Sequence, residues 1–391
     1  MPIVNRLADL ADEITAWRRD FHENPEVLYE TVRTAAKVAE LLESFGVDEV
    51  ATGIGKTGVV GVIKGRNGGA GRTVGLRADM DALPIEEETQ KPYASKIPGK
   101  MHACGHDGHT AMLLGAAKYL SETRNFDGTV VVIFQPAEEG GAGAKAMIDD
   151  GLMTRWPMDE VYGMHNYPGM PVGEFAICKG PIMAATDEFR ITVTGKGGHA
   201  AKPHQTVDPV VVGSKIVSAL QTIASRNANP LDSVVVSVTV FNAGSAFNVI
   251  PQDAVLRGTV RSLNADMRDM AEKRMGDIVT SIAAAFDATA KLEFRRGYPV
   301  TRNHDEQTDF AAEIAERIAG DGKVNRSIEP MMGGEDFSYM LEERPGAFIF
   351  AGNGDTAGLH HPEYDFNDEL IPVGCSYWVK LVETALPAKA A

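Results

Sequence analysis

Cysteine is scarce in this chain, with 3 residues among 391. So few cysteines, odd in number and widely spaced, exclude a disulfide framework and are typical of a reducing compartment. No apolar run approaches the roughly 18 residues that a membrane-spanning helix needs, so we expect no transmembrane segment. The first residues lack a basic stretch followed by an apolar one, which argues against a secretory signal. We therefore expect a cytoplasmic protein that does not interact with a membrane.

Positive charge is also in short supply. There are 38 Lys and Arg against 54 Asp and Glu, a formal net charge of −16. This balance disfavours nucleic acid and anionic membrane surfaces as partners. It does not exclude a small anionic substrate, because the local charge in a cleft can oppose the net charge. Hydrophobic residues make up 44% of the chain, enough for a large core, and the length predicts two or three domains.

Helix and strand patterns alternate through the first 180 residues. Helical spacing is found at 5–20, 31–45 and 109–122, and strand-like runs at 57–64, 73–78, 130–134, 161–164 and 173–178. The run at 130–134 is apolar and β-branched, which is typical of a buried parallel strand. Alternation of this kind predicts a layered α/β domain.

The pattern changes near residue 185. Strands are expected at 189–194, 233–241, 254–263 and 291–294, with helices at 208–225 and 265–286, which is the β-α-β-β-α-β order of a ferredoxin-like unit. The α/β pattern resumes at 308–319 and 347–351, and a last helix is expected at 369–387. We therefore predict a mixed-sheet α/β/α catalytic domain of residues 1–182 and 298–391. A smaller ferredoxin-like α+β domain, residues 183–297, interrupts it and would serve for dimerisation and as a lid.

One short segment concentrates residue types that bind metals. Residues 101–110 contain Cys104 and three histidines, His102, His106 and His109. This density of soft and borderline donors suggests a transition-metal site. Two glycines and the lack of apolar periodicity predict a loop that leads into a helix. Loops on a rigid scaffold are common places for catalytic groups.

Four further polar clusters each follow a short apolar run. They lie at 77–81, 135–141, 163–166 and 359–362. Acidic and imidazole side chains at the carboxyl ends of strands could meet at one edge of a sheet. Successive side chains of an extended backbone point to opposite sides, so one carboxylate of the Glu138–Glu139 pair could bind a metal while the other faces the water that the metal activates.

These stretches in series resemble the M20 metallopeptidase family, and within it the amidohydrolase branch. That branch contains hippurate hydrolases, N-acyl-amino-acid amidohydrolases and indole-acetyl-amino-acid hydrolases. The matching stretches lie in order along the chain, at 76–84, 101–109, 134–140, 163–165, 195–204, 247–251, 334–337 and 359–362. One such stretch would be weak evidence, whereas eight in series are specific.

The resemblance implies hydrolysis of the amide bond of N-acyl amino acids by a metal-activated water, with Glu138 as general base and acid. It implies two divalent ions per subunit, Zn²⁺ or Mn²⁺ with Co²⁺ or Ni²⁺ as alternatives, and the ligands Cys104, His106, Glu139, His165 and His360. Many relatives begin the site with His-x-Asp, where this chain has Arg77 and Asp79. A guanidinium has no free lone pair, so Arg77 cannot be a ligand. We expect Asp79 to orient a histidine instead.

The resemblance also assigns residues of the inserted domain. His199 would reach the active site of the partner subunit and stabilise the transition state there. Asn248 and Arg257 would help to bind the carboxylate of the substrate. We therefore expect a homodimer, or a tetramer, formed through the inserted domain. The acyl group and the amino acid stay open, because no motif marks the walls of the substrate pocket.

Three alternatives remain at this point. Cys104 could be a nucleophile paired with a histidine, in which case activity would survive chelation. The chain could be a metal-dependent dipeptidase or carboxypeptidase of the same fold. It could also be a metal-binding module without activity, although the intact Glu138 and ligand positions argue against this.

Overall fold

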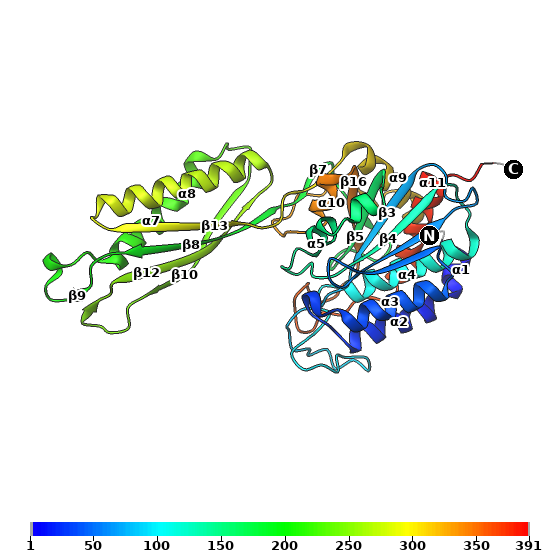
Figure 1. The fold of residues 1–391 in the computed structure, drawn as a ribbon, viewed down its shortest axis with the longest axis horizontal. Coiled ribbons are helices and arrows are strands. Elements are labelled where there is room, and N and C mark those ends of the chain that lie inside the picture. Colours follow the sequence, from blue (N-terminus) through cyan, green and yellow to red (C-terminus); the bar gives the residue numbers. More distant parts are fainter. Residues whose placement is uncertain (1–2, 390–391) are drawn as a thin grey trace. The chain divides into compact units, whose positions relative to one another are not determined.

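The computed structural model describes residues 3–389. They form two compact units (Figure 1), which are described separately. Unit 1 comprises the residues up to 182, residues 302–329 and the residues from 336 onward, and unit 2 comprises residues 183–301 and 330–335. Two short strands, β7 (Gly180–Met183) and β14 (Thr301–Asn303), lie where the chain passes between the units.

Unit 1 is built on an eight-stranded mixed sheet with the strand order β1-β2-β4-β3-β5-β16-β6-β15. The strands are β1 (Glu49–Ile54), β2 (Gly58–Lys64), β3 (Thr73–Asp79), β4 (Thr129–Gln135), β5 (Glu160–Tyr167), β6 (Phe175–Ala176), β15 (Val324–Asn325) and β16 (Gly346–Gly352). The central strands β4, β3, β5 and β16 are parallel to one another. The predicted parallel strand at 130–134 is thus parallel to β3, but its other neighbour, β2, is antiparallel. The strand expected at 173–178 shrinks to the two residues of β6.

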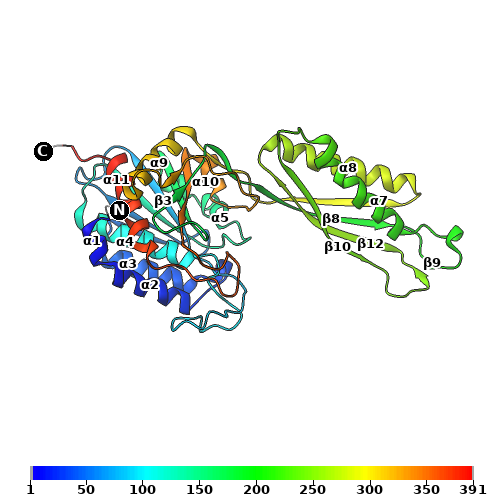
Figure 2. The same cartoon turned by 180° about the vertical axis from the view of Figure 1, so that it is seen from behind.

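Helices cover both faces of this sheet. One face packs against α1 (Asn5–Asp9), α2 (Ala11–Glu23), α3 (Val32–Ser44), α4 (His106–Thr123), α9 (Asp305–Ala319) and α11 (Leu370–Ala385), whose apolar residues join alternate strand residues in one large core. The other face is met by α5 (Gly143–Asp149), α6 (Leu152–Arg155) and α10 (Ser338–Glu343). The buried helix α4, drawn in cyan, and α11, drawn in red, lie side by side (Figure 2). The mixed-sheet α/β/α prediction is confirmed.

Unit 2 has its own sheet and its own core. Its four antiparallel strands, in the order β10-β12-β8-β13, are β8 (Ala185–Thr194), β10 (Val234–Ala243), β12 (Asp253–Ser262) and β13 (Thr289–Arg296). The helices α7 (Pro209–Thr222) and α8 (Ala265–Ala285) pack on one face of this sheet. A small ribbon of β9 (Gly198–His199) and β11 (Val249–Ile250) completes the unit. This is the ferredoxin-like arrangement that the sequence predicts.

Residues 3–389 contain neither a disulfide bond nor a helix that could span a membrane. The three cysteines are buried and unpaired. Within residues 3–389, no helix combines the length and the apolar character needed to cross a membrane.

Candidate metal centre

The central strands of unit 1 bring the polar clusters of the sequence to one edge of the sheet. Asp79 is the last residue of β3, and Glu138 and Glu139 follow the end of β4. Asp79 lies in register with Gln135, so the ends of these two parallel strands are level. His165 lies near the end of β5, which is parallel to β3. The predicted convergence of these segments is therefore observed.

The segment with Cys104 enters the site at the start of α4. The helix begins at His106, three residues before the predicted start, because Gly105 turns the chain with a φ of 91°. This left-handed conformation favours glycine. A Cβ at this position would collide with the Asn166 side chain and lie 2.7 Å from the Tyr364 hydroxyl. Gly105 thus allows the start of a buried helix to pass close to β5.

Five potential ligands gather at this point. Cys104 Sγ lies 3.4 Å from His165 Nε2, and Glu139 Oε1 lies 3.3 Å from His360 Nε2 and 3.9 Å from His106 Nε2. The donor atoms of Cys104, His106 and His165 all lie within 4.8 Å of one another, as do those of Cys104, Glu139 and His360. Cys104, His106 and His165 are buried, whereas the His360 side chain is 53% exposed.

His106 provides the test of whether a cation fits here. Both of its ring nitrogens are buried and lack a hydrogen-bond partner among the described residues. The nearest carboxylate oxygens, from Asp81, Asp79 and Glu139, lie 3.6, 3.7 and 3.9 Å from the ring nitrogens. Burial opposes a charge on His106, but these carboxylates outweigh burial and raise its pKa to about 10. An imidazole with unmade hydrogen bonds among carboxylates suits a divalent cation.

His165 has the protonation state of a metal ligand, whereas Cys104 is a thiol that would have to lose its proton to bind a cation. Burial, together with the charges of Glu139 and Glu138, raises the pKa of the Cys104 thiol well above its ordinary range. Burial lowers the pKa of His165 well below its ordinary value, so its ring is neutral. His165 Nδ1 donates to the carbonyl of Asn166 at 2.7 Å, which leaves the Nε2 lone pair facing Cys104.

Asp79 is held by two neighbours rather than left open. Its Oδ1 lies 2.6 Å from His109 Nδ1, and its Oδ2 accepts from the Arg77 guanidinium at 2.7 Å. Arg77 also donates to Gln135 at 2.8 Å and to Asp336 at 2.9 Å. His109 lies between Asp79 and Asn166, whose Oδ1 is 2.8 Å from His109 Nε2. Both carboxylate oxygens of Asp79 are thus engaged by side chains of unit 1.

Sequence reasoning missed the role of Asp81. Its carboxylate accepts the backbone N–H groups of Glu138 at 2.8 Å and Glu139 at 3.2 Å. It therefore fixes the turn from which both glutamates project. The signal was the second acid of the Arg-Ala-Asp-Met-Asp stretch, but only the fold shows what this acid bonds. His102, from the same histidine-rich segment as Cys104, is buried with both ring nitrogens unpartnered among the described residues.

The remaining candidates belong to unit 2. His199 is exposed on β9, and its Nδ1 accepts the backbone N–H of Ala201 at 3.2 Å. Asn248 immediately precedes β11, and its carbonyl accepts the N–H of Ala200. Arg257 is exposed on β12 and lies opposite Arg190 of β8. The fold of unit 2 places His199 and Asn248 together on the β9–β11 ribbon and Arg257 on the main sheet.

Comparison with known proteins finds relatives that match this chain over nearly its whole length. Residues 75–384 match peptidase family M20/M25/M40. A hippurate hydrolase from Campylobacter jejuni is 44% identical over 97% of this chain and 98% of its own, and thermostable carboxypeptidase 2 from Saccharolobus solfataricus is 42% identical over 93% of each. The crystal structure of a Bacillus subtilis protein described as a dinuclear metal-binding peptidase of the M20 family superimposes with a TM-score of 0.85, at 36% identity over 97% of this chain and 99% of that one. The resemblance found in the sequence is confirmed: this chain belongs to peptidase family M20/M25/M40 and is a metal-dependent amide hydrolase.

Proposed function

We propose that this protein hydrolyses the amide bond of N-acyl amino acids. The observation that carries the proposal is the convergence of Cys104, His106, Glu139, His165 and His360. Within this group, the buried imidazole of His106 has no hydrogen-bond partner among the described residues. The similarity to a hippurate hydrolase over nearly the full chain supports this substrate class, because hippurate is an N-acyl amino acid. The similarity to a carboxypeptidase makes cleavage of a C-terminal residue the second candidate.

The five residues would hold two divalent ions, for which Zn²⁺ and Mn²⁺ fit the mixed donor set best and Co²⁺ and Ni²⁺ are alternatives. When bound, such ions lower the pKa of water and polarise the scissile carbonyl. Glu138 is buried, and its backbone is fixed by Asp81. Its carboxylate would take the proton from the attacking water and pass it to the leaving amine nitrogen.

His199 would stabilise the oxyanion. Because its Nδ1 accepts a hydrogen bond from Ala201, the neutral ring carries its proton on Nε2. A donor of this kind is suited to the negative charge that develops on the carbonyl oxygen. Asn248 and Arg257 would contact the substrate carboxylate, for which an arginine offers a two-pronged donor.

We infer a homodimer formed through unit 2. Its strand β10 is an edge strand with Val235 and Phe241 exposed, and α7 exposes Val210 and Val211. Unpaired strand edges with apolar side chains favour pairing with a second copy. His199 would then act in the active site of the other subunit.

A cysteine nucleophile has one observation in its favour, the 3.4 Å between Cys104 Sγ and His165 Nε2. The pKa directions oppose it, because burial keeps the thiol protonated and the imidazole neutral. A thiolate–imidazolium pair would need both shifts reversed. Activity that persists after complete chelation would favour this alternative over the metal-dependent one.

The test compares two adjacent glutamates. Glu138→Gln should keep two metal ions per subunit and lose turnover of N-benzoylglycine and N-acetyl amino acids by about 10²–10⁴-fold, since it removes proton transfer alone. Glu139→Gln is the matched variant and should lose metal. Elemental analysis and steady-state hydrolysis measure both, with dipeptides and longer peptides in the substrate panel. Near-normal turnover in Glu138→Gln, or cleavage of peptides alone, would contradict the proposal.

A further inference from the structure

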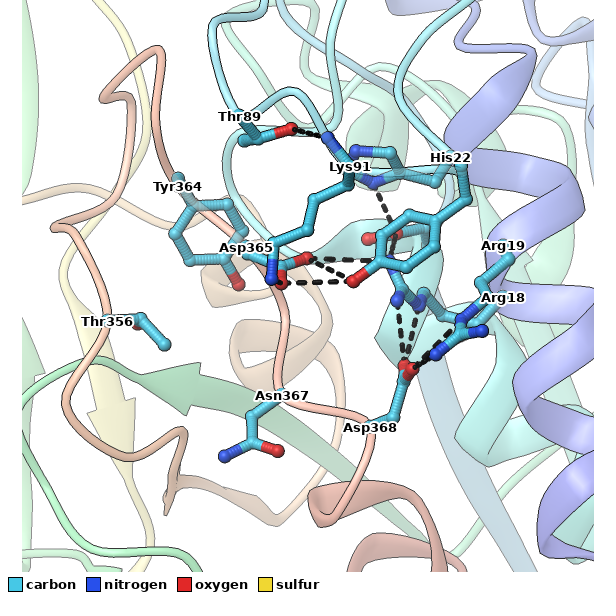
Figure 3. Close-up of polar contacts among 12 residues, drawn as sticks. Arg18, Arg19, His22, Thr89, Lys91, Thr356, Tyr364, Asp365, Asn367 and Asp368 are labelled. Carbon is cyan, nitrogen blue, oxygen red and sulfur yellow. Dashed lines mark hydrogen bonds and ion pairs between the residues drawn. The ribbon is translucent and has the colours of Figure 1, made fainter.

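A buried arginine of α2, Arg18, contacts the residues next to the candidate metal centre. The side chain of Arg18 is fully buried, and its guanidinium stacks 4.5 Å from the centre of the Tyr93 ring. Figure 3 shows Arg18 and the neighbouring Arg19 converging on Asp368, while Lys91 reaches Asp365. Arg18 Nε donates to Asp368 at 2.8 Å, and its Nη1 lies 3.3 Å from Asp107 and 3.9 Å from Asp365.

The three carboxylates come from the two segments that carry His106 and His360. Asp107 follows His106 in the first turn of α4, and its side chain is fully buried. Asp365 and Asp368 lie in the segment that follows His360. The guanidinium of Arg18 therefore links these two segments through ion pairs.

His360 depends on such anchoring more than the other candidate ligands do. Its side chain is 53% exposed, so packing does not hold it. Its backbone has a φ of 64°, a left-handed conformation that costs free energy in a residue other than glycine. Such conformations persist where the surrounding structure holds them. Its N–H donates to the carbonyl of Ala103 at 2.7 Å. Beyond His360, the segment is held by a hydrogen bond from the Glu88 N–H to the Pro362 carbonyl, at 2.9 Å, and by the ion pairs of Asp365 and Asp368.

We propose that Arg18 is a positioning residue of the metal centre, which holds the segment bearing His360 against the helix turn bearing His106. This inference rests on the ligand roles proposed above for the two histidines. A fully buried guanidinium is tolerated only where its partners are well placed, so the same contacts fix Asp107 and Asp368 relative to each other. The spacing of His106 and His360, and with it the affinity for the ion that His360 would bind, depends on this link.

The experiment measures zinc binding to metal-free protein by competition with a chromophoric chelator. Arg18→Met should bind one of the two zinc ions about 10- to 100-fold more weakly, the usual effect of removing a residue that supports a ligand, and the other with unchanged affinity. Arg18→Lys should give a smaller loss of zinc affinity. An ammonium keeps the positive charge but cannot donate to several carboxylates at once with the planar geometry of a guanidinium.

Arg19→Met is the matched control. Arg19 stacks on the same Tyr93 at 4.5 Å and pairs with the same Asp368 at 2.8 Å, but it is 46% exposed and lies on the outer side of the cluster. Both zinc affinities should be unchanged in this variant. Equal losses in Arg19→Met and Arg18→Met would overturn the specific role of Arg18.

The remaining outcomes separate this inference from the proposed function. If wild-type protein binds two zinc ions and Arg18→Met binds both normally, with only a lower melting temperature, Arg18 is structural and the inference is wrong. If wild-type protein binds no zinc, the ligand roles fail first and the inference fails with them. Should Arg18→Met not fold, Asp368→Asn decides in its place, because it weakens the closest ion pair of Arg18 at a position that is 21% exposed. Selective loss of one zinc ion supports the inference, and unchanged affinities overturn it.

Discussion

His22 carries a charge that its burial would ordinarily forbid. Its Nδ1 lies 2.8 Å from Asp107 Oδ2, and its Nε2 lies 3.4 Å from Glu87. Burial lowers the pKa of His22, but the charge of Asp107 and the hydrogen bonds to Asp107 and Glu87 outweigh it and raise the pKa to about 9. The protonated ring is thus part of the same buried ionic cluster as Arg18.

The stability of the protein should depend on pH through this residue. Because the pKa is higher in the folded than in the unfolded chain, where it is about 6.5, protonated His22 stabilises the fold fully below pH 6.5. That contribution, at most about 3 kcal/mol, is lost as the pH rises toward 9. The melting temperature of metal-free wild type should exceed that of His22→Gln most at pH 6, and the gap should narrow by pH 9.5. His204→Gln, at an exposed histidine of unit 2, is the control and should show no narrowing; a gap that is constant or grows for His22→Gln would contradict the assignment.

Residue types could be read from the sequence more readily than their partners could. Arg77 was excluded as a ligand because a guanidinium has no lone pair, and the structure places it against Asp79 and Asp336. The second of these partners is 259 residues away along the chain. The sequence around either residue does not indicate that the two are in contact, so this ion pair could be identified only from the fold.

At the scale of elements, the start of α4 is the critical junction. Gly105→Ala should destabilise the protein by more than about 1 kcal/mol, because alanine resists a φ of 91° and its Cβ would collide with Asn166. It should also lower metal content, since Cys104 and His106 flank the turn. Gly276→Ala is the matched control: Gly276 lies inside α8 with nothing within 4 Å of an added Cβ, and alanine there should stabilise by about 0.5–1 kcal/mol. Urea unfolding and elemental analysis test both variants, and equal effects on metal content would contradict the role of the turn.

The elements with strong periodicity were predicted from the sequence almost to their ends. The helix expected at 265–286 is α8 (Ala265–Ala285), and the strand expected at 347–351 is β16 (Gly346–Gly352). β1 was missed because its burial is slight and its sequence has no alternating pattern. The start of α4 was misjudged because His106 and Asp107 are polar residues buried inside the site, which hides the helical period.

At the scale of the whole molecule, the proposed dimer predicts that each active site combines Glu138 of one subunit with His199 of the other. His199→Asn and Glu138→Gln should each be nearly inactive alone. If His199 acts in the other subunit, mixing the two variants should restore about a quarter of wild-type activity, because half of the dimers are mixed and each has one complete site. The measurement is the activity after mixing and subunit exchange. As the control, each variant alone is taken through the same procedure. No recovery, with exchange verified by mass spectrometry of tagged subunits, would contradict action across the dimer.

The candidate site was predicted from the sequence because eight stretches recur in a fixed order, not because any one of them is distinctive. Cys104 and His106 suggest a metal site by their residue types alone. Glu139, His165 and His360 are assigned as ligands only because all eight stretches match the family in order. The supporting residues Arg18 and Asp81 were not found, because their importance comes from contacts between distant segments. A buried arginine in an amphipathic helix has no signature that separates it from an exposed one.

The insertion of unit 2 sets an order of events during synthesis. The four main strands of unit 2 lie between residues 185 and 296, so its sheet is complete once this stretch has left the ribosome. The sheet of unit 1 needs β16, which pairs with β5, and its helical layer needs α11. We therefore expect the later-encoded unit to fold first, while β5 waits with one edge open. That interval is when the nascent chain is most exposed to wrong strand pairing, and when a chaperone would matter most.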